Sequence, residues 1–145
     1  MSPPRRPRAE ARHAERQHFT PAEGIEARNS PLGGLGVFAT RAFADGDVIE
    51  RAPVLVVPIA QASAAPALAS FAFMWDDTHV GLTLGFGSLY NHAFEPNAEY
   101  VDEPSHARPA AKRFVALAPI AAGDEITINY NGDPDDTGPV GFDVS

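Results

Sequence analysis

Three stretches of this sequence hold residue types that could bind a ligand or carry out chemistry. The first is the turn at residues 30–36, where Gly33, Gly34 and Gly36 precede an apolar run. Glycine allows the backbone to approach a ligand closely. A dinucleotide-binding loop would need a helix after its glycines, whereas the segment after Gly36 has the pattern of a strand. That type of site is therefore excluded, and the loop alone is more typical of a plain turn.

The second stretch contains Asn91 and His92, followed closely by Pro96 and Asn97. Asn and His side chains can hydrogen-bond to backbone groups and fix a sharp chain path. An ordered polar loop is therefore predicted, with either a structural or a ligand-binding role. No second His or carboxylate stands at metal-ligand spacing, so no metal site is expected. Ser88 lies near His92 but lacks the strand–turn–helix elbow of a serine nucleophile.

The third candidate is Tyr130, which ends an alternating strand pattern next to Asn129. Such a tyrosine can pack in the core or present its hydroxyl group at a site. Composition alone favours the core.

Charge is distributed unevenly along the chain, whose net charge is −8. The segment 1–16 holds five Arg against two Glu, a balance of +3, which leaves −11 for the rest of the chain. An acidic body repels phosphates, so it is not expected to bind nucleic acid. It suits a cationic partner such as a Lys-bearing peptide, although acidic surfaces also keep small proteins soluble.

Several other classes of protein are excluded by composition. There is no Cys, which rules out a disulfide scaffold, a thiolate zinc site and a cysteine nucleophile. No apolar run has the ~20 residues that a membrane-spanning helix needs. The Arg- and Pro-rich start has no apolar stretch behind it, so a secretory signal is not expected there. A cytoplasmic protein is expected.

The spacing of turn residues predicts one mostly β domain with little helix. Residues 60–74 are Ala-rich and are expected to form a short helix or a loop insert, and residues 88–96 are expected to be irregular. Strands are predicted over residues 24–29, 37–42, 48–52, 54–59, 79–86, 98–101, 113–118 and 125–130.

Four motifs taken together resemble the SET domain in their order and spacing. They lie at residues 30–39, 45–50, 90–97 and 123–130, and the resemblance covers about residues 25–130. It is closest to the compact SET proteins of bacteria and chlorella viruses. The division that follows is a disordered arm at residues 1–22, a SET domain at 23–131, and a short tail at 132–145 without a zinc cluster.

The resemblance implies a β-clip fold of small curved sheets, in which the last strand passes beneath the Asn91–His92 loop to form a pseudoknot. It also implies a protein-lysine methyltransferase that uses S-adenosylmethionine and acts on a Lys-bearing protein or peptide, as a monomer or a homodimer. The alternative is a SET-fold module that binds a peptide with little or no catalysis.

The resemblance assigns roles to individual residues as well. In SET enzymes the positions of Gly34, Leu35 and Gly36 offer backbone groups to the methionine part of the cofactor. Those of Asn91 and His92 contact its amine and its adenine.

Further roles concern the transfer itself. The position of Tyr130 is at the methyl-transfer centre and also touches the cofactor. Tyr100 is expected to line the lysine channel and to help set how many methyl groups fit. Phe71 and Ile128 are further channel candidates, and Phe142 could close the cofactor site from the tail.

Four positions depart from the usual family pattern. A small residue, commonly Ser, follows Asn-His in the family and is Ala93 here. The next position is commonly Cys, although Phe also occurs, and it is Phe94 here. An acidic residue often precedes the last Tyr, but here it is Asn129, and Gly132 stands where a second Tyr would be expected. Cofactor binding is still expected, whereas the methylation rate and the product state do not follow from these motifs.

Overall fold

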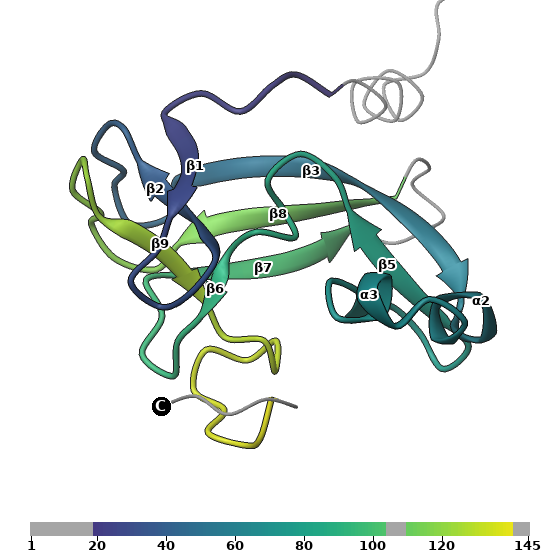
Figure 1. The fold of residues 1–145 in the computed structure, drawn as a ribbon. Coiled ribbons are helices and arrows are strands. Elements are labelled where there is room, and N and C mark those ends of the chain that lie inside the picture. The colour runs from purple at the N-terminus through teal and green to yellow at the C-terminus, as the bar shows by residue number, and fades with distance from the viewer. Residues whose placement is uncertain (1–18, 104–109, 141–145) are drawn as a thin grey trace, which may run out of the picture.

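The computed structural model describes residues 19–103 and 110–140. Its strands form two sheets, and Figure 1 shows that both are strongly curved. In the four-stranded sheet the order is β1 (Ile25–Asn29), β2 (Leu35–Ala39), β9 (Glu125–Ile128) and β6 (Asn91–His92). In the five-stranded sheet the order is β4 (Phe73–Met74), β5 (His79–Thr83), β3 (Val48–Pro58), β8 (Ala111–Ala116) and β7 (Ala98–Glu103).

Helix is scarce in the described part of the chain, as the sequence predicted. The Ala-rich insert forms α2 (Ile59–Ser63) and α3 (Pro66–Ala69), which follow the end of β3 and lie beside β5 (Figure 1). The mostly β fold of small curved sheets is therefore confirmed. None of the described helices is long and apolar enough to cross a membrane.

One predicted strand boundary is wrong. The sequence suggested two strands separated at Pro53, but β3 continues without a break from Val48 to Pro58. Proline cannot donate a ladder hydrogen bond. The strand tolerates it because β5 pairs with β3 only from Val54 onward, so Pro53 has a strand neighbour on the β8 side alone.

The core draws apolar side chains from both sheets. Strand β9 alternates buried and partly buried residues, whereas Gly36–Ala39 of β2 are all buried. The largest fully buried apolar side chains are Tyr90, Phe43, Phe114, Ile120, Ile126, Ile128 and Val37. Phe43 and Ile120 pair in an isolated antiparallel bridge. Each is followed directly by a turn, at residues 44–47 and 121–124.

A carboxyl group lies inside this core. Glu50 of β3 is 6% exposed. Its two oxygens accept hydrogen bonds from the Tyr90 hydroxyl, at 2.9 Å, and from the Phe86 backbone N–H, at 3.0 Å. Burial raises the pKa of Glu50 above its ordinary value of 4.5, although both hydrogen bonds oppose that shift.

This burial predicts how stability depends on pH. Because the folded-state pKa of Glu50 is raised, the protonated form is favoured by folding, and stability is lost as pH rises from about 4.5 through the folded pKa. A Glu50→Gln variant lacks this titration. The free energy of unfolding of the wild type, minus that of the variant, should therefore fall as pH is raised from 4 to 7 in urea titrations. A difference that does not vary with pH would contradict the assignment.

Candidate active site

The last strand pairs with the Asn91–His92 segment. Strands β6 and β9 are parallel, with Asn91 opposite Thr127 and His92 opposite Ile128 (Figure 1). The Ala93 N–H donates to the Ile128 carbonyl at 2.9 Å. Two segments that lie far apart in the sequence are thereby fixed side by side.

Asn97 extends this pairing with its side chain. Its amide donates to the Glu125 carbonyl at 2.8 Å, and its side-chain oxygen accepts the Thr127 N–H at 2.9 Å. One side-chain amide thus pairs with one carbonyl and one N–H of β9, as a neighbouring strand would. This accounts for an Asn at the end of the 90–97 motif.

Glu125 joins the glycine loop to this junction. Its carboxylate accepts from the Ser30 hydroxyl at 2.7 Å and from the Asn91 side-chain amide at 2.8 Å. The same amide donates to the Leu35 carbonyl at 3.1 Å. A Cβ at Gly36 would lie 2.8 Å from the Asn91 nitrogen and would collide with the Glu125 carboxylate. Gly36 is therefore required for this close approach.

Gly34 serves a different need. Its φ of +59° lies in the left-handed region, and a Cβ there would meet nothing within 4 Å. Leu35 beside it is half exposed. The outer side of the loop is therefore open, whereas Gly36 on its inner side is tightly packed.

Tyr130 follows directly after this junction. Its N–H donates to Nδ1 of His92 at 3.0 Å, and its hydroxyl donates to the Tyr90 carbonyl at 2.6 Å. Burial, and to a smaller extent the Glu125 carboxylate, raise the pKa of Tyr130. Its hydroxyl therefore stays protonated at neutral pH and remains a hydrogen-bond donor.

His92 holds the backbone of Tyr130 only while the imidazole is neutral, because a protonated Nδ1 cannot accept. Burial lowers the pKa of His92, which favours that neutral form. Its ring lies 5.2 Å from the ring of Tyr130 and 4.4 Å from that of Phe94, measured between centroids.

Three rings, those of Phe73, Tyr100 and Tyr130, form what we call the aromatic cluster. The Phe73 centroid lies 5.1 Å from Tyr100 and 6.4 Å from Tyr130, both in edge-to-face geometry. The Tyr100 hydroxyl donates to the Tyr130 carbonyl at 3.3 Å. Burial, together with the Asp102 carboxylate, raises the pKa of Tyr100 to about 12. A low-polarity surface with two neutral phenols results.

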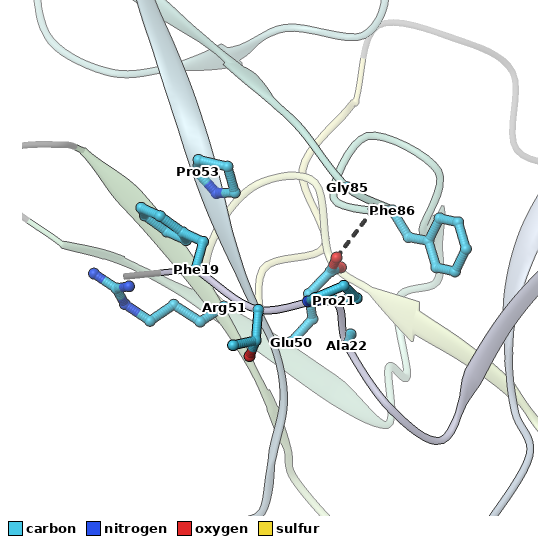
Figure 2. A pocket seen from close by; sticks show the side chains of 9 residues that line it. Phe19, Pro21, Ala22, Glu50, Arg51, Pro53, Gly85 and Phe86 are labelled. Carbon is cyan, nitrogen blue, oxygen red and sulfur yellow. Dashed lines mark hydrogen bonds between the residues drawn. The ribbon is translucent and has the colours of Figure 1, made fainter. Parts of the chain in front are cut away.

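A separate cavity of about 370 Å³ lies beside Glu50. Figure 2 shows Glu50 in its wall, between Phe86 and the N-terminal segment that carries Phe19 and Pro21. None of the residues predicted to bind a ligand lines this cavity. Glu50 is nevertheless linked to the candidate site through Tyr90. Its carboxylate accepts from the Tyr90 hydroxyl, and the Tyr90 carbonyl accepts from the Tyr130 hydroxyl.

Comparison with known proteins identifies the family. A sequence model of the SET domain matches residues 34–131, which is more than half of the chain. The chain belongs to the SET domain family.

Relatives of this SET domain point to lysine methylation in general. A histone-lysine N-methyltransferase of Schizosaccharomyces pombe, specific for H3 lysine-37, is 28% identical over 109 residues, which are 73% of this chain and 72% of that protein. A crystal structure of a Plasmodium falciparum protein described as a histone methyltransferase superposes with a TM-score of 0.65 at 27% identity. That match covers 77% of this chain and 95% of the other.

The structure of the SET domain brings most of the predicted site residues together. Gly36, Leu35, Asn91 and His92 are joined through Glu125 and β9, and Tyr130 and Tyr100 meet in the aromatic cluster. Ile128 is fully buried in the core beside His92.

Two predicted residues lie elsewhere. Phe71 is 51% exposed, and the ring that packs against Tyr100 is that of Phe73, two positions further on. Phe142 lies outside the described residues, so its expected role stays a prediction. The expected disordered arm at residues 1–22 is described only from Phe19, which lies under the guanidinium of Arg51.

The Asn at position 129 has a structural use of its own. It is buried, and its side-chain amide donates to the Asp136 carbonyl at 2.5 Å, while its oxygen accepts the Asn131 N–H at 3.0 Å. The amide thereby ties the tail to the end of β9. An acidic side chain could accept the second bond but could not donate the first.

Among residues 19–103 and 110–140, no group of three or more His, Cys, Asp or Glu side chains could hold an ion.

Proposed function

We propose that this SET domain transfers a methyl group from S-adenosylmethionine to the side-chain nitrogen of a lysine in a protein substrate. One observation carries the proposal. Tyr130 connects the junction of Gly36, Asn91 and Glu125 with the aromatic cluster. A group bound at the junction and a group bound at the cluster would therefore both lie next to the same phenol.

The residues at the junction fit the cofactor. S-adenosylmethionine supplies a sulfonium methyl group, which is electrophilic without further activation. The open outer side of Gly34 gives the room, and the Glu125 carboxylate suits an α-ammonium, because a carboxylate can accept more hydrogen bonds than the two it receives from Ser30 and Asn91. The exposed edge of Phe94 beside His92 offers an apolar surface for a purine.

The aromatic cluster fits an alkyl ammonium side chain. Rings of Phe and Tyr pack against the methylene stem of a lysine. The acidic body of the chain, at −11 once the segment 1–16 is set aside, favours a basic substrate. A lysine attacks only as a neutral amine, so the low-polarity cluster helps by disfavouring the charged form.

Tyr130 would then orient the reacting groups. Its hydroxyl is held by the Tyr90 carbonyl at 2.6 Å, and its main chain is held by His92. Both contacts fix the phenol, so that an amine and a methyl group can be aligned beside it for in-line transfer. A carboxylate–His pair is not needed as a general base, because the proton of the substrate amine can leave to solvent.

The direct test is to incubate the full chain with isotopically labelled S-adenosylmethionine and either recombinant histone H3 or a lysate of its own cell. Labelled lysines identified by mass spectrometry would support the proposal. A folded protein that binds the cofactor but labels no lysine would refute it. A folded protein that binds a basic peptide and no cofactor would favour a SET-fold binding module instead.

Substitution of Tyr100 should alter how many methyl groups are added. A Tyr100→Phe change removes the hydroxyl that donates to the Tyr130 carbonyl, and it frees space within the aromatic cluster. We expect product peptides to carry more methyl groups per lysine than those of the wild type, by mass spectrometry. A Leu68→Ala change on exposed α3 is the control. An unchanged methylation state with Tyr100→Phe would contradict the assigned role.

A further inference from the structure

The only lysine in the sequence is buried, and its ammonium lies against the aromatic cluster. Lys112 of β8 has a side chain with no exposed surface. Its Nζ lies 4.1 Å from the ring centroid of Phe73 and 4.0 Å from that of Tyr100. The same Nζ donates to the Asp102 carboxylate at 2.7 Å.

Stability alone does not explain this arrangement. Lysine is rarely buried completely, and a buried ion pair gains little over apolar side chains of similar size. Burial lowers the pKa of Lys112, but its hydrogen bond and attraction to Asp102 oppose that shift. The short contact between Nζ and the Asp102 oxygen is typical of a hydrogen bond between charged partners.

The ammonium of Lys112 lies over the rings of Phe73 and Tyr100, while the carboxylates of Asp102 and Glu125 act on the cluster through Tyr100 and Tyr130. Strand β7 contributes Asp102, directly opposite Lys112, and Tyr100, whose phenol is neutral. Strand β3 presents the apolar Ala52 opposite, and β4 presents Phe73. The Asp102 side chain is 36% exposed whereas that of Lys112 is fully buried. Solvent therefore screens the carboxylate more strongly than the ammonium.

We infer that Lys112 is a fixed positive charge behind the rings of Phe73 and Tyr100, which disfavours the ammonium form of a substrate lysine bound at the cluster. The substrate proton passes to solvent, and the neutral amine becomes available at a lower pH. This inference rests on the proposed function. Two like charges within about 12 Å, at an effective dielectric constant of about 20, lower a pKa by about one unit.

Lys112 is thus a positioning residue that acts on the protonation state of the substrate amine. The test is the dependence of the methyl-transfer rate on pH. Single-turnover methyl transfer to histone H3, or to the strongest substrate from the lysate assay, is measured across pH with three chains. These are the wild type, Lys112→Met and Lys112→Arg. The midpoint of the rise in rate should move up by about one pH unit in Lys112→Met and stay near the wild-type value in Lys112→Arg.

The outcomes separate the inference from the proposed function. At high pH the Lys112→Met rate should return close to that of the wild type, since only protonation is affected. A rate that falls equally at every pH, with no shift of the midpoint, overturns the inference and leaves the proposed function intact. A folded wild type that methylates no lysine overturns both.

Folding of the variants is checked by circular dichroism. Where Lys112→Met does not fold, the Lys112→Met, Asp102→Leu double variant replaces it, because it removes both charges of the buried pair. An upward shift of the midpoint is still expected, but a smaller one than in Lys112→Met, because the loss of the screened carboxylate offsets part of the loss of the buried ammonium. An unshifted midpoint in that variant also overturns the inference.

Discussion

Replacement of Tyr130 by Phe should lower the rate of methyl transfer by about 100-fold, with the fold unchanged. The variant loses one hydroxyl, which donates to the Tyr90 carbonyl at 2.6 Å and is the polar group at the meeting point of the two halves of the site. With its proton held by that carbonyl, the phenol oxygen is the acceptor that would orient the amine, and loss of one preorganised polar contact in an active site typically costs about 10²–10³ in rate. The ring contacts with His92 and Phe73 do not need the hydroxyl and should persist.

Three measurements on Tyr130→Phe separate chemistry from structure. The single-turnover rate should fall, the affinity for S-adenosylhomocysteine should change by no more than a few-fold, and the melting temperature should change by only a few degrees. Transfer at the wild-type rate would show that the phenol does not take part. A large fall in melting temperature would show a structural role instead.

Substitution of Gly36 by Ala, which adds one methyl group to the side chain, should weaken cofactor binding by about tenfold or more. In a Gly36→Ala variant the new Cβ would lie 2.8 Å from the Asn91 nitrogen and against the Glu125 carboxylate, so the glycine loop and the junction must move apart. Overpacking of this kind also costs about 1–3 kcal/mol of stability. Calorimetric titration with S-adenosylhomocysteine measures the affinity directly.

Gly46→Ala is the matched control for Gly36→Ala. Gly46 has a φ of +86° and lies in the turn at residues 44–47, with open space around it. Its substitution should also reduce stability, through backbone strain, but should leave cofactor affinity unchanged. Equal affinity losses in both variants would mean that Gly36 acts through global stability. Wild-type affinity in folded Gly36→Ala would remove the loop from the site.

Much of the fold was predictable because turn residues punctuate the strands. The turns at residues 44–47 and 121–124 directly precede β3 and β9. In β9, buried and partly buried residues alternate as expected for a strand. The parallel pairing of β6 with β9 could not be derived from local patterns, because β6 spans only Asn91 and His92. It was anticipated only through the resemblance of four motifs to the SET domain.

Parts of the site escaped prediction for reasons that can be named. Glu125 follows a turn and has the pattern of a surface residue, yet its partner Ser30 lies near the other end of the chain. Phe73 lies in an insert of two short helices and a very short strand, which has no clear periodicity, so the neighbouring Phe71 was selected instead. Lys112 lies just before the predicted strand at 113–118, and lysine is expected at a surface.

The central claim is that the glycine loop, the Asn91–His92 segment and Tyr130 bind one cofactor. An amide NMR titration of the full chain with S-adenosylhomocysteine tests it most directly. Saturable shifts should concentrate at Gly34–Gly36, Asn91, His92 and Tyr130, and should be small around the cavity beside Phe19 and Pro53. Saturable binding with shifts confined to that cavity, or no binding by the folded chain, would contradict the account.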